Sequence, residues 1–138
     1  MKNKICLDTG IVTQFYSENT PESILQLMKS VLEGKIEAYI LAPILIEIFY
    51  HICVLRGKQS AETTVATFLN KYPVKLVNLD QTLIYKAGRL KCQHRNRLSY
   101  NDCYAIAYSL NNKLIFHTTE KELKEDLLNL KIVNHSFA

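Results

Sequence analysis

Four acidic residues, each placed just after a hydrophobic stretch, are the residues of this sequence best suited to carry out chemistry. They are Asp8 after KICL, Glu47 after PILI, Asp102 after LSYN and Glu120 after KLIFHTT. Apolar runs followed by helical patterns predict a parallel α/β sheet, in which functional groups lie at the carboxyl ends of the strands. Carboxylates that converge there repel one another unless cations bind between them. The pattern therefore indicates a divalent-metal nuclease.

Glu47 is the hardest of the four to explain as an ordinary surface residue. It lies between residues 44–46 (ILI) and 48–50 (IFY), in an almost wholly apolar helical stretch. A carboxylate buried there needs a partner or a metal, whereas a solvent-facing position on the helix is the alternative. Asp8 has a simpler alternative, because Asp is common in turns for its local hydrogen bonds.

The other two acids fall where helices are expected to begin. Ser99 and Asp102 have the spacing of a capping box, and a helix start also fixes the position of a carboxylate. Thr119 and Glu122 have the same spacing, which predicts a second capping box and leaves Glu120 in the first turn without a capping role. Stabilisation of the helix dipole is the alternative role for Glu120.

The elements that must position these acids alternate between strand and helix. We predict strands at 4–7, 38–41, 74–79 (buried) and 113–116, with an edge strand at 131–133. The first expected helices run over 21–34 after an N-cap at Thr20, from 43 to about 57, and from a cap at Ser60 to residue 71. Three more are expected to begin at Asp80, Ser99 and Thr119. Short connections imply right-handed crossovers. The prediction is a three-layer α/β/α sandwich with a central parallel sheet of four to five strands, formed by one domain over residues 1–138.

Composition favours an ordinary globular protein. Of the 138 residues, 48% are hydrophobic and 22% are charged, and no apolar run is long enough to span a membrane. The basic start is followed by only three apolar residues, so we expect no signal peptide. Four cysteines without C-x-x-C spacing predict reduced thiols and a cytoplasmic location. The net charge is +4, and drawing four acids into one site leaves the remaining surface more basic, which is compatible with a polyanionic partner.

Four segments give the chain a family resemblance: residues 5–9 (ICLDT), Glu47, residues 98–107 (LSYNDCYAIA) and residues 118–123 (TTEKEL). With these the chain resembles, over nearly its whole length, the PIN-domain family and within it the small ribonucleases of the VapC toxin type. The resemblance implies a Mg²⁺- or Mn²⁺-dependent ribonuclease, a homodimer, and an antitoxin protein as partner. It also implies the site residues: catalytic and metal-binding Asp8, Glu47, Asp102 and Glu120, with Thr118 as a supporting polar group.

The chain departs from the family pattern at two positions. The family usually has Asp where this chain has Glu120, and often Ser or Asn where it has Gly10. Glu lengthens the fourth side chain by one methylene, and Asp126 is a possible substitute for it. The departure leaves open an alternative function, a catalytically inactive PIN-like module that binds RNA or protein.

Two other functions are excluded by the residues that follow the first strand. A haloacid-dehalogenase-like phosphatase needs a second Asp two residues after the first, where this chain has Gly10. A mononucleotide-binding module needs a Gly-rich loop there, which is missing. In the nuclease, one or two Mg²⁺ ions held by carboxylates would activate a water for attack on phosphorus.

The densest basic run, residues 86–97, leads directly towards Asp102. We predict that four of its residues contact RNA phosphates: Arg89, Lys91, Arg95 and Arg97. Such contacts give salt-sensitive affinity without sequence preference. The alternative is a solvated helix face. Nearby tyrosines, at positions 85, 100 and 104, can stack on bases or pack in the core.

Overall fold

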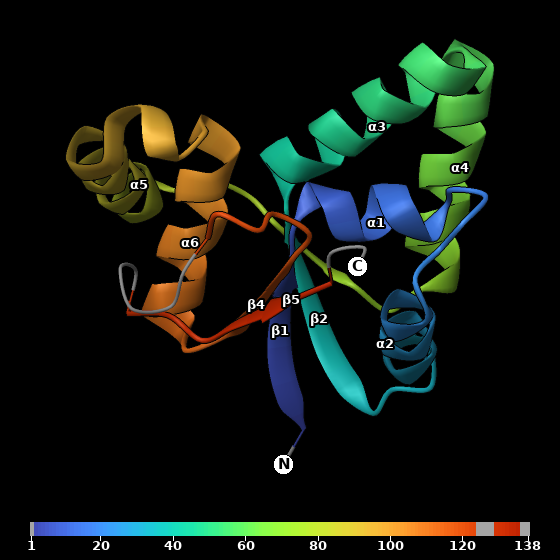
Figure 1. Cartoon of the computed structure of the whole chain (residues 1–138), viewed down its shortest axis with the longest axis horizontal. Helices are drawn as coiled ribbons and strands as arrows, with labels where there is room; N and C mark the ends of the chain where they lie inside the picture. Colours follow the sequence, from blue (N-terminus) through green and yellow to red (C-terminus); the bar gives the residue numbers. More distant parts are fainter. Residues whose placement is uncertain (1, 124–128, 136–138) are drawn as a thin grey trace.

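Five parallel strands form one sheet in the order β3-β2-β1-β4-β5 (Figure 1). The computed structural model describes residues 2–123 and 129–135. The strands are β1 (Asn3–Leu7), β2 (Ile36–Leu41), β3 (Lys75–Val77), β4 (Ile115–Thr118) and β5 (Ile132–Asn134). The predicted parallel sheet of four to five strands is therefore confirmed, with β1 at its centre.

Helices cover both faces of this sheet. They are α1 (Thr9–Phe15), α2 (Glu22–Leu32), α3 (Ala42–Arg56), α4 (Lys58–Lys71), α5 (Gln81–His94) and α6 (Tyr100–Asn112), with a short 3₁₀ turn, η1 (Arg95–Arg97). Helices α5 and α6 lie on one side of the sheet and α1 to α4 on the other, which confirms the three-layer architecture (Figure 1). None of the helices in the described residues is long and apolar enough to cross a membrane.

The three central strands form the core, and this burial determines where the polar residues lie. Ile5, Cys6 and Leu7 of β1 are buried, as is Phe116 of β4. Parallel strands covered on both faces are mainly apolar, so functional polar groups gather where the strands end. Asp8 is the first residue beyond β1.

The prediction of a buried strand over 74–79 was wrong. Strand β3 has three residues and lies at the edge of the sheet, where Lys75 and Leu76 are exposed. Lys75 forms an ion pair with Glu37 of β2. A short edge strand that carries a charge is a common way to protect a sheet edge from pairing with other chains.

Helix α1 was not predicted, because Asp8 looked like a turn residue. Asp8 is the N-cap of α1, and its Oδ1 accepts a hydrogen bond from the Thr9 amide at 2.8 Å. Thr20, predicted as the N-cap of the next helix, instead donates its hydroxyl to the Gln14 carbonyl of α1 at 2.9 Å. Pro21 occupies the N-cap position of α2.

One further cap differs from prediction and two agree. Ser60 lies inside α4, which begins after Gly57, where a φ of +90° suits glycine. Asp80 caps α5 through a bond from the Leu83 amide, as predicted. Ser99 and Asp102 form the predicted capping box of α6.

No helix begins at Thr119, contrary to prediction. Residues 119–123 form a loop with a turn, and Glu120 donates its amide to the Thr118 hydroxyl at 3.1 Å. This local bond gives the backbone an alternative to a helical turn. The rest of the expected helix, including Asp126, lies largely outside the described residues.

Candidate metal centre

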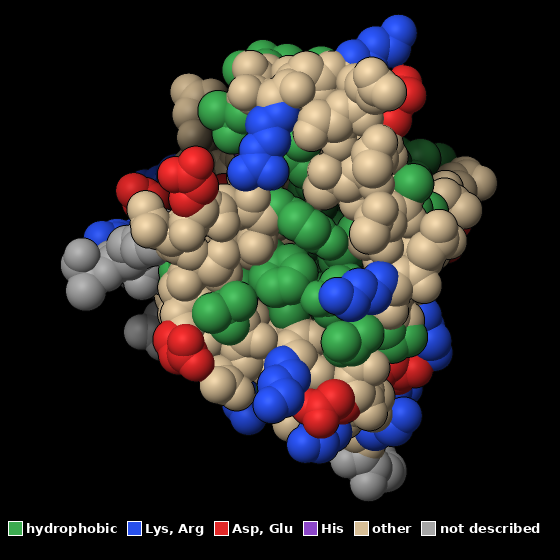
Figure 2. Space-filling view, turned by 90° about the vertical axis from the view of Figure 1, so that its right-hand side faces the viewer, with side chains coloured by type: hydrophobic (Ala, Val, Ile, Leu, Met, Phe, Trp, Pro, Cys, Tyr) green, Lys and Arg blue, Asp and Glu red, His purple; other side chains and the backbone are tan. Residues whose placement is uncertain are grey.

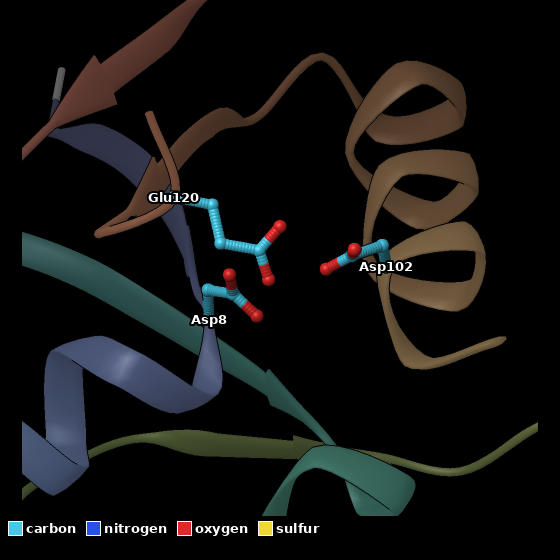
Figure 3. Close-up of side chains that lie close together, drawn as sticks. All are labelled: Asp8, Asp102 and Glu120. Carbon is cyan, nitrogen blue, oxygen red and sulfur yellow. The ribbon is translucent and has the colours of Figure 1, made fainter. Parts of the chain in front are cut away.

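Three of the four predicted acids meet at the carboxyl end of the sheet. Asp8 follows β1, Glu120 lies two residues beyond β4, and Asp102 is in the first turn of α6. Strands β1 and β4 are neighbours, so the segments that follow them run side by side. One carboxylate oxygen from each of Asp8, Asp102 and Glu120 lies within 4.8 Å of the other two, and the three side chains point towards one another (Figure 3).

Hydrogen bonds fix both oxygens of Asp8. Oδ1 caps α1, and Oδ2 accepts a bond from the Thr118 hydroxyl at 2.7 Å. The Thr118 hydroxyl in turn accepts the amide of Glu120. One threonine therefore links two acids of the cluster.

Asp102 combines its capping duty with a place in the cluster. Its Oδ2 accepts the Ser99 amide at 3.3 Å, while the Ser99 hydroxyl accepts the Asp102 amide at 3.0 Å. The side chain is buried, and one of its carboxylate oxygens lies within 4.8 Å of an oxygen of Glu120. The capping and cluster readings of Asp102 are thus compatible.

Burial and like charge raise the pKa of all three acids. Burial, reinforced by the charge of Asp102, raises the pKa of Asp8 to about 6, although bonds from Thr118 and Thr9 oppose the rise. Burial and the charges of Asp102 and Asp8 raise the pKa of Glu120 to about 8. Burial also raises the pKa of Asp102.

The donor set fits a hard divalent cation. Three carboxylates supply only oxygen ligands, which Mg²⁺ and Mn²⁺ prefer. The raised pKa values show that the cluster opposes ionisation of its own groups. A bound cation would relieve this repulsion.

Glu47 lies beside this cluster on α3 but is not one of its three members. Its side chain is half-buried, rather than fully buried or solvent-facing. Oε1 accepts two hydrogen bonds, from the Thr9 hydroxyl at 2.6 Å and from the Asn101 side-chain amide at 2.9 Å. The sequence analysis did not identify Thr9 and Asn101 as site residues. The sequence feature that could have indicated them is that each is adjacent to an aspartate of the cluster.

The departure at Gly10 has a steric reason. A Cβ atom at position 10 would lie 2.0 Å from Thr119 Oγ1 and 3.1 Å from Thr119 Cβ. The Thr119 side chain therefore occupies the space that the Ser or Asn often found there in the family would need.

The structure divides the basic run into two parts. Arg95 and Arg97 are exposed in η1, just before the first turn of α6 that carries Asp102. Arg89 instead lines a cavity of about 350 Å³ between α5 and α6, with Lys86. Lys91 donates to the backbone carbonyls of Arg95 and Leu98, and its ammonium group lies 4.8 Å from the centre of the Tyr100 ring.

The tyrosines divide in a similar way. Tyr85 and Tyr100 are exposed, and Tyr104 packs against the core. Exposed Tyr100 follows the N-cap of α6 and is two residues from Asp102.

Known structures share this fold. VapBC2 from Rickettsia felis, bound to a DNA fragment from its promoter, matches with a TM-score of 0.74 and 16% identity, over 95% of this chain and 98% of that one. DNA-bound VapBC from Salmonella typhimurium matches with a TM-score of 0.72 and 17% identity, over 97% and 98%. VapC20 from Mycobacterium tuberculosis, a toxin that cleaves the sarcin-ricin loop, matches with a TM-score of 0.64 and 16% identity, over 80% of this chain and 84% of that one.

At these identities the likeness establishes the fold and nothing further. No curated protein sequence is similar enough to the chain to count as a match. Residues 5–126, however, match the family model of the PIN domain. That match runs from β1 to beyond β4 and includes all four acids, and the chain belongs to the PIN domain family.

Proposed function

We propose that the protein is a metal-dependent endoribonuclease that hydrolyses phosphodiester bonds of RNA, with Mg²⁺ or Mn²⁺ as cofactor. The observation that carries this proposal is the convergence of Asp8, Asp102 and Glu120, from three separate elements, within 4.8 Å. Buried carboxylates rarely share a site without partners of opposite charge. Membership of the PIN domain family and the likeness to a toxin that cleaves the sarcin-ricin loop support the choice of RNA.

In this proposal the chain holds the ion and presents the substrate. Asp8, Asp102 and Glu120 bind the metal, and Thr118 orients Asp8 through its hydroxyl. The ion, when bound, supplies an activated water and stabilises the negative charge that develops on phosphate. Arg95 and Arg97, exposed in η1 just before α6, supply cations for the RNA backbone, and exposed Tyr100 offers a surface for base stacking.

We further propose that the protein acts in the cytoplasm as the toxin of a toxin–antitoxin pair. All four cysteines are unpaired, which suits a reducing compartment. The structural neighbours from Rickettsia felis and Salmonella typhimurium are VapBC complexes. The face on the side of α2 and α4 has a patch of hydrophobic side chains with both basic and acidic side chains around it, which suits an apolar antitoxin segment with a polar rim (Figure 2).

A cleavage assay with charge-removing variants tests the nuclease. Purified protein is incubated with single-stranded RNA and Mn²⁺ or EDTA. We expect cleavage by the wild type only with metal, and none by Asp8→Asn or Asp102→Asn. Glu62→Gln, an exposed acid on α4, is the control that keeps full activity.

The outcomes separate the two functions that the sequence allowed. Full cleavage by either aspartate variant would contradict the roles assigned to these residues. A folded wild type that binds RNA but leaves it intact with every divalent metal tested would favour the inactive binding module.

A further inference from the structure

The residues next to the two cluster aspartates share a single partner. Thr9 follows Asp8, and Asn101 precedes Asp102. Both side chains donate to the same atom, Glu47 Oε1, at 2.6 and 2.9 Å. These contacts join residues that are 38 and 54 positions apart in the chain.

The shared oxygen connects the three helices around the site. Thr9 opens α1, Asn101 lies in the first turn of α6, and Glu47 lies on α3, which contacts both helices. Hydrogen bonds to an ionised acceptor are shorter and about twice as strong as those between neutral groups. The Glu47 carboxylate therefore fixes the start of α1 relative to the start of α6.

Holding the two helix starts together also holds together two carboxylates that repel each other, those of Asp8 and Asp102. Asp8 and Asp102 lie in the same cluster, and the charge of Asp102 acts on Asp8. Each aspartate is the chain neighbour of a residue that donates a hydrogen bond to Glu47. These two hydrogen bonds form a bridge through Glu47 that opposes the separation of Asp8 and Asp102. Metal sites tolerate little error in the positions of their ligands. Residues that do not themselves touch the metal commonly set those positions through hydrogen bonds.

We infer that Glu47 is a positioning residue, which holds Thr9 and Asn101 through Oε1 and thereby sets the separation of the Asp8 and Asp102 carboxylates. This inference rests on the proposed metal site and alters one part of it, because Glu47 then acts through its hydrogen bonds rather than as a metal ligand. Thr9 and Asn101 are positioning residues of the same site.

Glutamine at position 47 distinguishes the two roles. Its amide oxygen can accept both hydrogen bonds, but the side chain carries no charge. The dissociation constant (Kd) for Mn²⁺, measured by calorimetry, is compared between Glu47→Gln and Glu47→Ala. We expect Glu47→Ala to raise Kd by roughly 10- to 100-fold, as is typical for residues that orient metal ligands. Glu47→Gln should raise it by less than that range.

Substitution of Thr9, one of the two residues that donate to Glu47, gives a second test that leaves Glu47 unchanged. Thr9→Val removes the hydroxyl and keeps the shape, whereas Thr9→Ser keeps the hydroxyl. We expect Thr9→Val, but not Thr9→Ser, to raise the Kd for Mn²⁺. In the Glu47→Ala background Thr9→Val should add little, because the two changes remove the same bond.

The possible failures are distinguishable. If Glu47→Gln weakens Mn²⁺ binding as much as Glu47→Ala, and Thr9→Val has no effect, then Glu47 acts through its charge and the inference is wrong. If the folded wild type binds no Mn²⁺ or Mg²⁺, the proposed function fails and the inference fails with it. Melting curves without metal show whether each variant is folded.

Discussion

At the scale of single residues, Glu120 shows how a longer side chain changes the site. Its backbone amide is held by the Thr118 hydroxyl, and its carboxyl group reaches that of Asp102 from the loop after β4. Burial and the charges of Asp102 and Asp8 raise the pKa of Glu120 to about 8. The metal-free site is therefore protonated at a pH where ordinary carboxylates are ionised.

This protonation predicts an unusual pH dependence for the metal-free protein. The pKa of Glu120 is raised to about 8 and that of Asp8 to about 6, both above the values of an unfolded chain. Between the unfolded and folded pKa values the native state binds more protons, so its stability falls as pH rises. We expect the melting temperature in EDTA to fall between pH 6 and about 8.5, and to fall less in Glu120→Gln.

The control for this experiment is Glu62→Gln, an exposed acid that should leave the profile unchanged. Saturating Mn²⁺ should remove most of the fall in the wild type, because a ligand that binds only the native state stabilises it. Parallel pH profiles for the wild type and Glu120→Gln in EDTA would show that Glu120 ionises like an exposed side chain.

At the scale of elements, the sequence predicted those that rest on long apolar runs. Strands β1, β2 and β4 were found because central parallel strands are apolar throughout. Helix α1 was missed because it is short and its N-cap, Asp8, is also a site residue. Strand β3 looked buried from its β-forming residues, but residue types alone do not distinguish an edge strand from a central one.

Two identical capping patterns had different outcomes, and tertiary contacts explain why. Ser99 and Asp102 cap α6 as predicted. Thr119 and Glu122 have the same spacing, but the neighbouring Thr118 hydroxyl bonds both Asp8 and the Glu120 amide, which holds residue 120 in a loop. The hydrogen bonds of Thr9 and Asn101 to Glu47 could not be predicted from the sequence either, because they join residues far apart in the chain.

The basic run on α5 and η1 leads to a prediction about its two ends. Arg95 and Arg97 precede α6 on the side of its first turn, whereas Arg89 lines a cavity with Asn111 at the last turn. Nine residues separate Asn111 from Asp102, which is about 13 Å along a helix. We expect the double variant Arg95→Gln, Arg97→Gln to weaken RNA binding more than Arg89→Gln does.

Salt dependence is the measurement that tests this assignment. Each lost phosphate contact should flatten the plot of log affinity against log salt by about 0.7 for single-stranded RNA. Binding is measured with Asp8→Asn protein, so that the RNA stays intact. Equal slopes for the parent and the double variant would mean that η1 is only a solvated surface.

At the scale of the whole molecule, helix α3 is apolar on two opposite sides. Ile44, Ile48 and Ile52 face the core, and the outer side carries four exposed hydrophobic residues. These are Ile46 (71% exposed), Tyr50 (62%), Val54 (65%) and Leu55 (74%). A helix that is apolar all round is normally buried. We therefore expect another protein surface to cover the outer stripe, Ile46 to Leu55.

A second copy of this chain fits the stripe, because an uncharged apolar surface can pair with itself about a two-fold axis without repulsion. We expect the wild type to sediment with twice the chain mass of 15.9 kDa. The double variant Tyr50→Lys, Val54→Lys should sediment as a monomer, since it would bring like charges together in an apolar interface. Leu25→Lys, at an exposed position of α2, is the matched control and should remain a dimer. A wild type that stays monomeric at high concentration would contradict this assignment of the stripe.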